Sequence, residues 1–547
     1  MRLVDYLDKG ASLGEDAPCL VCGEDTWSYA EVVDLSHRVA AGLRARGVAP
    51  GAKVAILSAN DPVAFASVFG ISRAGGVWCP INPRSEAAEN RELLELFGCS
   101  ALIFQSAFAA LVDQIRSELP DLTTLVCLDG SYDWALTWEE FLSGSERSGP
   151  EPVETAEANE PPGADDLAMV VGTGGTTGRP KGVMLTGTNL ETMSAITLMA
   201  YPWPDAPERP TYLALAPLTH AAGVLCFPVL CLGGKIVVMR TPDVGAFLEH
   251  IEREQVTHTF LPPTLIYLVL DHPALPSSDL RSLRCFWYGA APMSSTRLDE
   301  ALTRIGPVMA QLFGQTEAPM MIATMSPADH FHEDGSVAIE RLSSAGRPAP
   351  LVTVSIMGER GALLGSGERG EIVVRSSLVM RGYLDNPEAT AEASAHGWHH
   401  TGDIGYLDED GFLHIVDRAK DMVITGGFNV YSTEVEQALM THPAVADCAV
   451  VGLPDEKWGE RVTAVVLPRP GAEVDVAELK AYVKERIGAV KTPKQIEVWP
   501  DLPRSKVGKV LKTEIKKSLV GGAESADLPP CLAKRSEREG ADAPTRP

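Results

Sequence analysis

The chain has 547 residues, of which 45% are hydrophobic and 22% are charged. This length exceeds what one compact core supports, so we expect more than one domain. The formal net charge of −26 disfavours nucleic acids and anionic membranes as partners, because both carry phosphate charge. The apolar stretch 224–239 is interrupted by proline, glycine and lysine, and the first ten residues lack the apolar core of a signal peptide. A cytoplasmic protein without membrane insertion is therefore expected.

The first predicted strand contains the one CxxC pair among the ten cysteines, Cys19 and Cys22. A zinc site of this type needs a second pair at comparable spacing, and the sequence has none. We therefore expect reduced, buried cysteines and no metal centre built from thiols.

Helix and strand patterns then alternate along the chain. The spacing of apolar residues predicts helices over 29–46 and 62–74, and short strands over 53–57 and 77–81. This alternation is typical of an α/β fold with largely parallel strands. The same kind of signal continues to about residue 340.

The last third of the chain changes character. Turn-forming glycines at 365, 367 and 370 precede a strand over 372–375, and short strands continue to about residue 416. A charged break at 417–421 leads to a smaller unit with strands over 446–452 and 461–468 and a helix over 476–486. We expect a large N-terminal domain (1–417) of α/β subdomains with a β-rich subregion, a hinge (418–421), a small α+β domain (422–520) and a disordered tail (521–547).

The strongest local signal is the glycine-rich stretch 170–183, VVGTGGTTGRPKGV. Its glycines allow backbone N–H groups to approach phosphate oxygens, its threonines add hydroxyl donors, and Lys181 adds positive charge. The stretch matches neither a Walker A pattern nor GxGxxG. Composition alone therefore favours phosphate binding only modestly over a surface turn.

This loop resembles the phosphate loop of the adenylate-forming superfamily, which includes acyl-CoA synthetases, luciferases and peptide-synthetase adenylation domains. Further segments resemble other motifs of the superfamily, in the same order. They are residues 216–220 with Gly223, 288–292 (YGAAP), 313–317 (FGQTE), 400–403 (HTGD), 417–418 (DR), 421–434 and 503–509 (PRSKVGK).

The resemblance assigns the catalytic roles. It implies that His220 positions the substrate carboxylate, that Thr316 contacts the α-phosphate, that Glu317 holds Mg²⁺, and that Lys509 is the catalytic lysine, with Lys506 and Lys512 as nearby lysines of no assigned role. Taken alone, His220 reads as a structural histidine, Glu317 as a solvated loop carboxylate, and the stretch 503–509 as a basic, solvated tail.

The resemblance also assigns the binding residues for ATP or AMP and for coenzyme A. The residues implied to bind the phosphates are Thr173, Gly174, Gly175, Thr176, Thr177, Gly178 and Lys181. Those implied to bind the base are Gly289, Ala290, Ala291, Pro292, Phe313, Gly314 and Gln315. Asp403 and Arg418 are implied to bind ribose, and Gly426 and Gly427 are implied to contact the pantetheine arm. Lys420 takes the hinge position, about which the small domain is expected to swing between the two steps.

Several positions depart from the superfamily pattern. Gly174 stands where a serine is usual, and the loss of a hydrogen bond to a charged group, about 1.5–3 kcal/mol, would slow adenylation about ten- to a hundredfold. Gly172 and Gly187 stand where larger residues are common, and Ser432 replaces a common proline, a change expected to matter little. One hypothesis is an enzyme that mainly transfers a supplied acyl-adenylate to CoA, and the alternative is an ordinary synthetase that tolerates Gly174.

The segments expected to line the acyl pocket, 218–227 and 288–292, are apolar and rich in small residues. No acidic residue lies near His220 to bind an amino group, so a hydrophobic carboxylic acid is the expected substrate. The predicted activity is an acyl-CoA ligase that forms an acyl-adenylate and then a CoA thioester. The alternatives are an enzyme that stops at the adenylate or loads a carrier protein, and a non-catalytic binding homologue.

Overall fold

The structure is a computed structural model that describes residues 1–143, 163, 165–173, 180–455, 457–504 and 510–521. The chain divides into two units, Met1–Val416 and Asp417–Pro547, and the division falls inside strand β21 (Leu413–Arg418).

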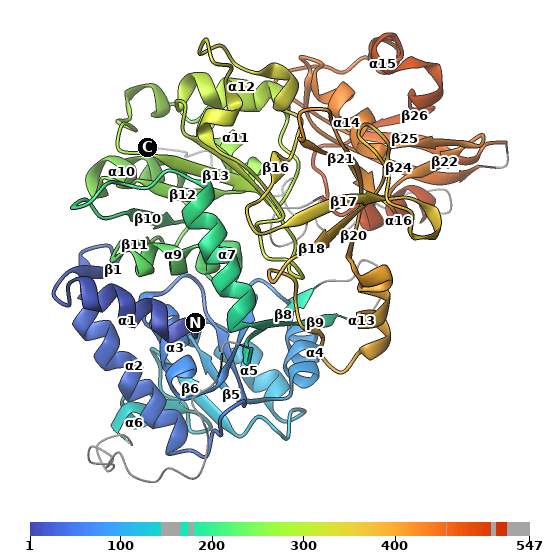
Figure 1. The fold of residues 1–547 in the computed structure, drawn as a ribbon. Coiled ribbons are helices and arrows are strands. Elements are labelled where there is room, and N and C mark those ends of the chain that lie inside the picture. Colours follow the sequence, from blue (N-terminus) through green and yellow to red (C-terminus); the bar gives the residue numbers. More distant parts are fainter. Residues whose placement is uncertain (144–162, 164, 174–179, 456, 505–509, 522–547) are drawn as a thin grey trace, which may run out of the picture. The chain divides into compact units, whose positions relative to one another are not determined.

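The first unit contains two large sheets (Figure 1). One runs in the order β16 (Arg347–Pro348), β15 (Ala323–Met325), β14 (Met309–Phe313), β13 (Cys285–Gly289), β12 (His258–Leu261), β10 (Thr211–Ala214), β11 (Lys235–Val238), β1 (Pro18–Cys22) and β2 (Asp25–Ser28). The central strands are parallel, and antiparallel strands lie at both ends.

The second sheet runs in the order β19 (Gly382–Tyr383), β9 (Lys181–Thr186), β8 (Leu167–Thr173), β4 (Val77–Ile81), β3 (Lys53–Leu57), β5 (Cys99–Phe104), β6 (Thr124–Cys127) and β7 (Leu136–Thr137). The strands from β8 to β7 pair in parallel, whereas β8, β9 and β19 pair antiparallel. An antiparallel sheet of β17 (Thr353–Met357), β18 (Gly370–Arg375), β20 (His399–Leu407) and β21 completes the unit.

Helices pack beside these sheets. They are α1 (Leu3–Leu13), α2 (Tyr29–Arg44), α3 (Pro62–Arg73), α4 (Ala87–Phe97), α5 (Ala109–Arg116), α6 (Trp138–Ser143), α7 (Gly187–Ala200), α8 (Ala221–Val224), α9 (Cys226–Cys231), α10 (Val244–Glu254), α11 (Pro263–Asp271), α12 (Ser295–Arg304) and α13 (Pro387–Ala393). Local signals explain the boundaries of two of them. A capping box between Ser28 and Glu31 starts α2, and Asp61 caps α3, whose first residue is Pro62.

The second unit is built on a sheet of β23 (Phe428–Val430), β22 (Val423–Thr425), β25 (Gly459–Pro468) and β24 (Val445–Asp455), with β26 (Gln495–Val498) parallel to β25. Its helices are α14 (Ser432–Met440), α15 (Val476–Lys491) and α16 (Lys512–Gly521). Gly488, at φ +82°, interrupts α15.

The predicted early helices and strands are confirmed as α2, β3, α3 and β4, with ends displaced by two residues or fewer. The α/β fold with a β-rich subregion and a small C-terminal unit is confirmed as well. Cys19 and Cys22 are buried and unbridged, as expected. The predicted disordered tail lies outside the described residues except for Gly521, which ends α16.

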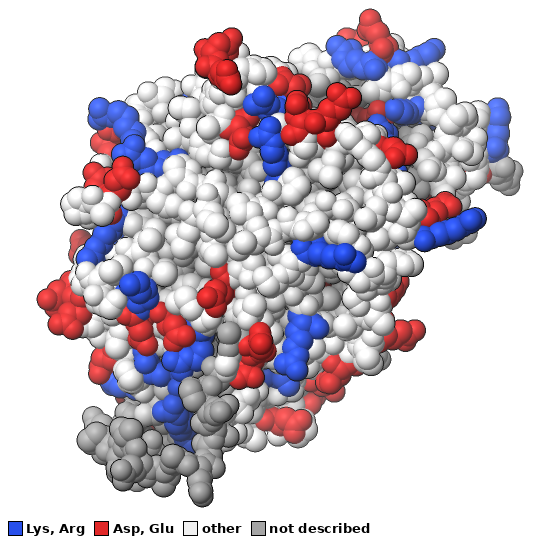
Figure 2. All heavy atoms as spheres, in the orientation of Figure 1, with Lys and Arg blue, Asp and Glu red and all other residues white. Residues whose placement is uncertain are grey.

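Acidic and basic side chains are interspersed on the face of the described residues in view in Figure 2. The Lys and Arg side chains in view form no continuous basic patch, as is reasonable for a chain with a net charge of −26. No helix among the described residues is long and apolar enough to cross a membrane.

Candidate functional site

The predicted phosphate loop connects two paired strands. Thr173 ends β8 and pairs with Lys181, which begins β9. Gly174, Gly175, Thr176, Thr177 and Gly178 lie outside the described residues, so the structure fixes the two ends of the loop only.

Lys181 lies over the ring of Tyr383, with Nζ at 4.7 Å from the ring centroid. The Tyr383 hydroxyl donates a hydrogen bond of 2.8 Å to Oε1 of Glu317, the predicted magnesium ligand. Burial, with the Glu317 carboxylate adding to it, raises the pKa of Tyr383, so this hydroxyl remains a proton donor at physiological pH. One tyrosine, which no sequence pattern singles out, therefore contacts two predicted site residues.

Strand β14 ends at Phe313, and the turn after it carries the residues from Gly314 to Glu317. A side chain on Gly314 would place Cβ 2.3 Å from the backbone nitrogen of Met320, so only glycine fits there. Gln315 donates from Nε2 to Asp403 Oδ2 at 2.8 Å and to the Thr401 carbonyl at 2.7 Å. The predicted ribose ligand Asp403, buried in β20, is thereby linked to the turn that carries Thr316 and Glu317.

His399 is a second side chain that sequence reasoning missed. It is 5% exposed, and its Nε2 has no hydrogen-bond partner among the described residues. Burial lowers the pKa of His399, and the negative charge of Glu317 opposes that shift. Position 399 carries no recognisable pattern of its own, so only the fold identifies it as a neighbour of Glu317.

The predicted adenine turn follows β13. Gly289 allows β13 and β14 to meet closely, because a Cβ there would lie 2.3 Å from the Leu312 carbonyl oxygen. Ala290 has φ +66°, a left-handed conformation that non-glycine residues rarely adopt outside turns and strained sites. Ala290 and Pro292 are exposed and Ala291 is half-buried, so this small-residue turn presents backbone to solvent.

A buried network supports the adenine turn from behind. The Tyr288 hydroxyl lies 3.0 Å from Nε2 of His330 and 3.2 Å from Oε1 of Gln311. Nδ1 of His330 lies 2.9 Å from the Ser326 carbonyl, which assigns the proton to Nδ1 and leaves Nε2 as the acceptor.

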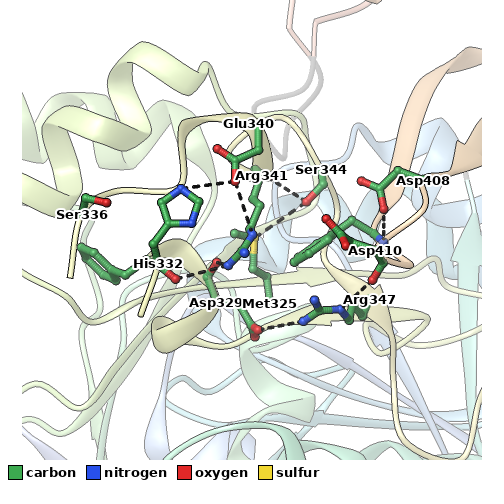
Figure 3. A network of polar contacts seen from close by, with 12 residues as sticks. Met325, Asp329, His332, Ser336, Glu340, Arg341, Ser344, Arg347, Asp408 and Asp410 are labelled. Carbon is green, nitrogen blue, oxygen red and sulfur yellow. Dashed lines mark hydrogen bonds and ion pairs between the residues drawn. The ribbon is translucent and has the colours of Figure 1, made fainter. Parts of the chain in front are cut away.

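The segment that holds His330 is itself fixed by charged side chains, as Figure 3 shows. Arg347 reaches Oδ1 of Asp329 at 3.3 Å, and Arg341 donates to the carbonyls of Asp329 and Phe331. Arg347 also donates to the Asp410 carbonyl at 3.1 Å. These contacts tie the 3₁₀ turn Pro327–His330 to β16 and to the turn before β21.

His220 precedes α8, with its Nδ1 at 2.9 Å from Thr219 Oγ1. Leu218, Ala222 and Phe227 around it are buried. Gly223 is required at its place, because a Cβ there would lie 1.9 Å from the Leu218 carbonyl oxygen. The predicted acyl-pocket segment is thus apolar and tightly turned.

The second unit carries the other predicted residues. Arg418 and Lys420 are exposed in a turn closed by the Asp421 N–H donating to the Arg418 carbonyl at 2.9 Å. Gly426 and Gly427, with φ +58° and +83°, form the β22–β23 turn. A Cβ at Gly426 would lie 2.9 Å from the Trp458 ring, and Lys457 lies 4.9 Å from that ring's centroid. Lys509 lies outside the described residues.

Lys512, to which the resemblance assigns no role, is not a solvated side chain. Its side chain is 18% exposed, and Nζ contacts Glu436 Oε1 at 2.8 Å and Ser432 Oγ at 2.6 Å. Ser432 in turn donates from its N–H and hydroxyl to Asp417. A proline at 432 has no N–H, so Ser432 makes a hydrogen bond to Asp417 that the usual proline cannot make.

Among the described residues there is no cluster of three or more His, Cys, Asp or Glu side chains that could hold a metal ion. Mg²⁺ in phosphate chemistry is commonly held by one or two carboxylates together with substrate phosphates. A single oriented carboxylate, Glu317, fits an ion of that kind.

Comparison with known proteins defines the class. Residues 7–384 match the family model of the AMP-binding enzymes, and residues 434–509 match the AMP-binding enzyme C-terminal domain. The chain belongs to this adenylate-forming family, in its acyl-CoA ligase branch, and is an acid–thiol ligase that uses ATP, Mg²⁺ and coenzyme A.

Particular relatives share most of their length with this chain. It is 36% identical to the medium/long-chain-fatty-acid–CoA ligase FadD8 of Mycobacterium tuberculosis, covering 94% of this chain and 89% of that protein. It is also 36% identical to a feruloyl-CoA synthase of Amycolatopsis, covering 93% and 97%. The amide bond synthetase McbA of Marinactinospora thermotolerans superposes with a TM-score of 0.84 at 31% identity, covering 94% and 99%.

Proposed function

We propose that this enzyme joins a hydrophobic carboxylic acid to coenzyme A through an acyl-adenylate. The observation that carries the proposal is the linked arrangement of Lys181, Tyr383 and Glu317, together with Gln315 and Asp403. This arrangement supports the proposal because it links a cation to the two carboxylates proposed to hold Mg²⁺ and ribose, all within one unit. ATP needs these groups together.

In the first half-reaction, the carboxylate oxygen of the acid attacks the α-phosphorus of ATP, and pyrophosphate leaves. Lys509, Lys181 and the loop donors would stabilise the charge on the phosphates, and bound Mg²⁺ would neutralise phosphate charge further. Thr316 would contact the α-phosphate, and His220 would orient the acid.

In the second half-reaction, the CoA thiol attacks the adenylate carbonyl, a thioester forms, and AMP leaves with the thiol proton released. The β22–β23 turn supports this role, because Gly426 and Gly427 lack side chains that would obstruct a pantetheine arm. The nearby Trp458 and Lys457 offer an aromatic face and a cation to the CoA nucleotide.

The substrate is proposed to be apolar because the segment near His220 is built from buried apolar and small residues such as Leu218, Ala222 and Phe227. The two curated relatives named above act on acids as different as fatty acids and ferulate. A roomy pocket for an aliphatic or aromatic acid agrees with both.

We further propose that Gly174 weakens adenylation, so that transfer of a supplied adenylate dominates. The test is a panel of aliphatic and aromatic acids, each assayed by ATP–pyrophosphate exchange and, separately, as preformed adenylate with CoA. Gly174→Ser is expected to raise exchange about tenfold or more, and to leave transfer unchanged. Rapid exchange in the unmodified enzyme would contradict the Gly174 proposal. No thioester from any acid would contradict the ligase proposal.

A second candidate function is amide formation, favoured by the structural similarity to McbA. An amine would then replace the thiol as the attacking group. The same preformed adenylates, incubated with CoA or with amines, distinguish the two, since AMP release that requires CoA excludes an amine as the acceptor.

A further inference from the structure

Tyr383 lies where two predicted parts of the nucleotide site meet. It ends β19, and β19 pairs antiparallel with β9 through Tyr383 opposite Val183 and Gly382 opposite Met184. Strand β9 begins at Lys181, directly after the phosphate loop. The backbone of β19 is therefore fixed relative to the end of that loop.

The residues around Tyr383 make further backbone bonds to both parts. Leu384 N–H donates to the Gly182 carbonyl at 2.7 Å, and Met380 N–H donates to the Glu317 carbonyl at 2.7 Å. One short segment is thus hydrogen-bonded to the phosphate-loop strand and to the turn that carries the predicted magnesium ligand.

The conformation of this segment is specified locally. Gly382 has φ +149°, and a Cβ there would lie 2.8 Å from Thr390 Cγ2. The Thr390 hydroxyl accepts from the Tyr383 N–H at 2.9 Å and donates to the Asn386 carbonyl at 2.8 Å. Helix α13 therefore holds the Tyr383 backbone, which limits where its side chain can point.

The Tyr383 side chain contacts both Glu317 and Lys181. Its hydroxyl donates to one oxygen of Glu317, which restricts rotation of the carboxylate, and its ring face lies 4.7 Å from the Lys181 ammonium. Hydrogen bonds of this kind to a metal-binding carboxylate orient it and tune metal affinity.

We propose that Tyr383 is a positioning residue that orients Glu317 for the nucleotide-bound Mg²⁺ and Lys181 for the phosphates. The inference rests on the proposed function for the identity of the nucleotide, and it adds a residue that the family resemblance did not assign. The Tyr383 hydroxyl orients the Glu317 carboxylate, and the Tyr383 ring orients the Lys181 ammonium, so the two contributions can be separated by mutation.

The experiment measures Mn²⁺ binding, by electron paramagnetic resonance of the free ion, to the full chain with a non-hydrolysable ATP analogue. Tyr383→Phe keeps the ring and is expected to weaken Mn²⁺ binding about tenfold. In a Glu317→Ala background the same change should matter less than about twofold, because the acceptor of its hydrogen bond is gone. Tyr383→Leu should weaken nucleotide binding further, and this extra loss should vanish in Lys181→Gln.

Tyr406→Phe is the matched control, since the Tyr406 ring stacks on His414 and not on Lys181, and it should bind Mn²⁺ as the unmodified chain does. An unchanged Mn²⁺ affinity in Tyr383→Phe, an equal loss with and without Glu317, or no Mn²⁺–nucleotide binding by the unmodified chain would each overturn the inference. No acid or CoA is used, so failure of thioester formation with an intact binding cycle would count against the proposed function alone.

Discussion

Burial sets the charge of His330, the residue that supports the adenine turn. It is 0% exposed, and burial lowers its pKa from 6.5 to about 4, partly offset by its bond to the Ser326 carbonyl. The unfolded chain binds a proton at this residue near pH 6.5, whereas the folded chain does so only near pH 4. The folded state therefore loses stability as pH falls through this window.

The expected loss from His330 alone is about 3 kcal/mol of unfolding free energy between pH 7 and pH 4. In His330→Gln, which cannot titrate, the fall in unfolding free energy over this range should be smaller than in the unmodified chain by about that amount. Urea unfolding at a series of pH values measures it. His332→Gln, in the same loop with a side chain 42% exposed, controls for loss of an imidazole. A His330→Gln difference no larger than the control's would contradict the account.

At the scale of secondary-structure elements, the first residue of α16 ties the second unit together. Lys512 pairs with Glu436 of α14, and its Nζ also contacts Ser432, the first residue of that helix. Burial raises the pKa of Glu436, and the nearby Lys512 charge opposes that shift. Removing the lysine would leave a carboxylate of 19% exposure without its counter-charge.

Lys512→Met should therefore destabilise the chain by about 3 kcal/mol, the low end for breaking a buried ion pair. The double variant Lys512→Met with Glu436→Gln should lose less than the sum of the two single changes. Lys517→Met breaks an exposed pair with Glu514 in the same helix and should cost less than about 1 kcal/mol. Denaturant unfolding of the four variants measures this, and equal losses for Lys512→Met and Lys517→Met would refute it.

The elements differ in how far the sequence could predict them. Strands β3 and β4 and helices α2 and α3 follow from apolar periodicity and local capping, so they were predictable with nearly correct ends. Strand β19 has only two residues and no periodicity, so its pairing with β9 could not be foreseen. Tyr383 depends on that pairing, and for this reason it was missed while Lys181 and Glu317 were found by resemblance.

Long-range burial explains the other misses. Lys512 and Ser432 are eighty residues apart in the chain, and a charged side chain next to predicted basic motif residues reads as solvated until its partner is known. His399 likewise becomes informative only when Glu317 is brought near it. Short sequence motifs identify residues that take part in the chemistry. The contacts between distant segments that support those residues cannot be predicted from such motifs.

At the scale of the whole molecule, the two half-reactions require different groups of the protein beside the same acyl group. On the proposed assignments, Lys509 acts at the phosphates in the first step, and the Gly426–Gly427 turn lies beside the thiol in the second. The resemblance predicts that the small domain swings about Lys420 between the two steps. Lys420 lies in the exposed turn that begins at Arg418.

Lys420→Pro should separate the two half-reactions, because proline fixes φ near −65° and so restricts rotation at that residue. Thioester formation is expected to fall by about tenfold or more, while formation of the adenylate by pyrophosphate exchange stays within about threefold. Lys420→Ala is the matched control, since it removes the side chain and keeps φ free. If alanine impairs thioester formation as much as proline does, the side chain of Lys420 and not rotation of its backbone is what the second step requires.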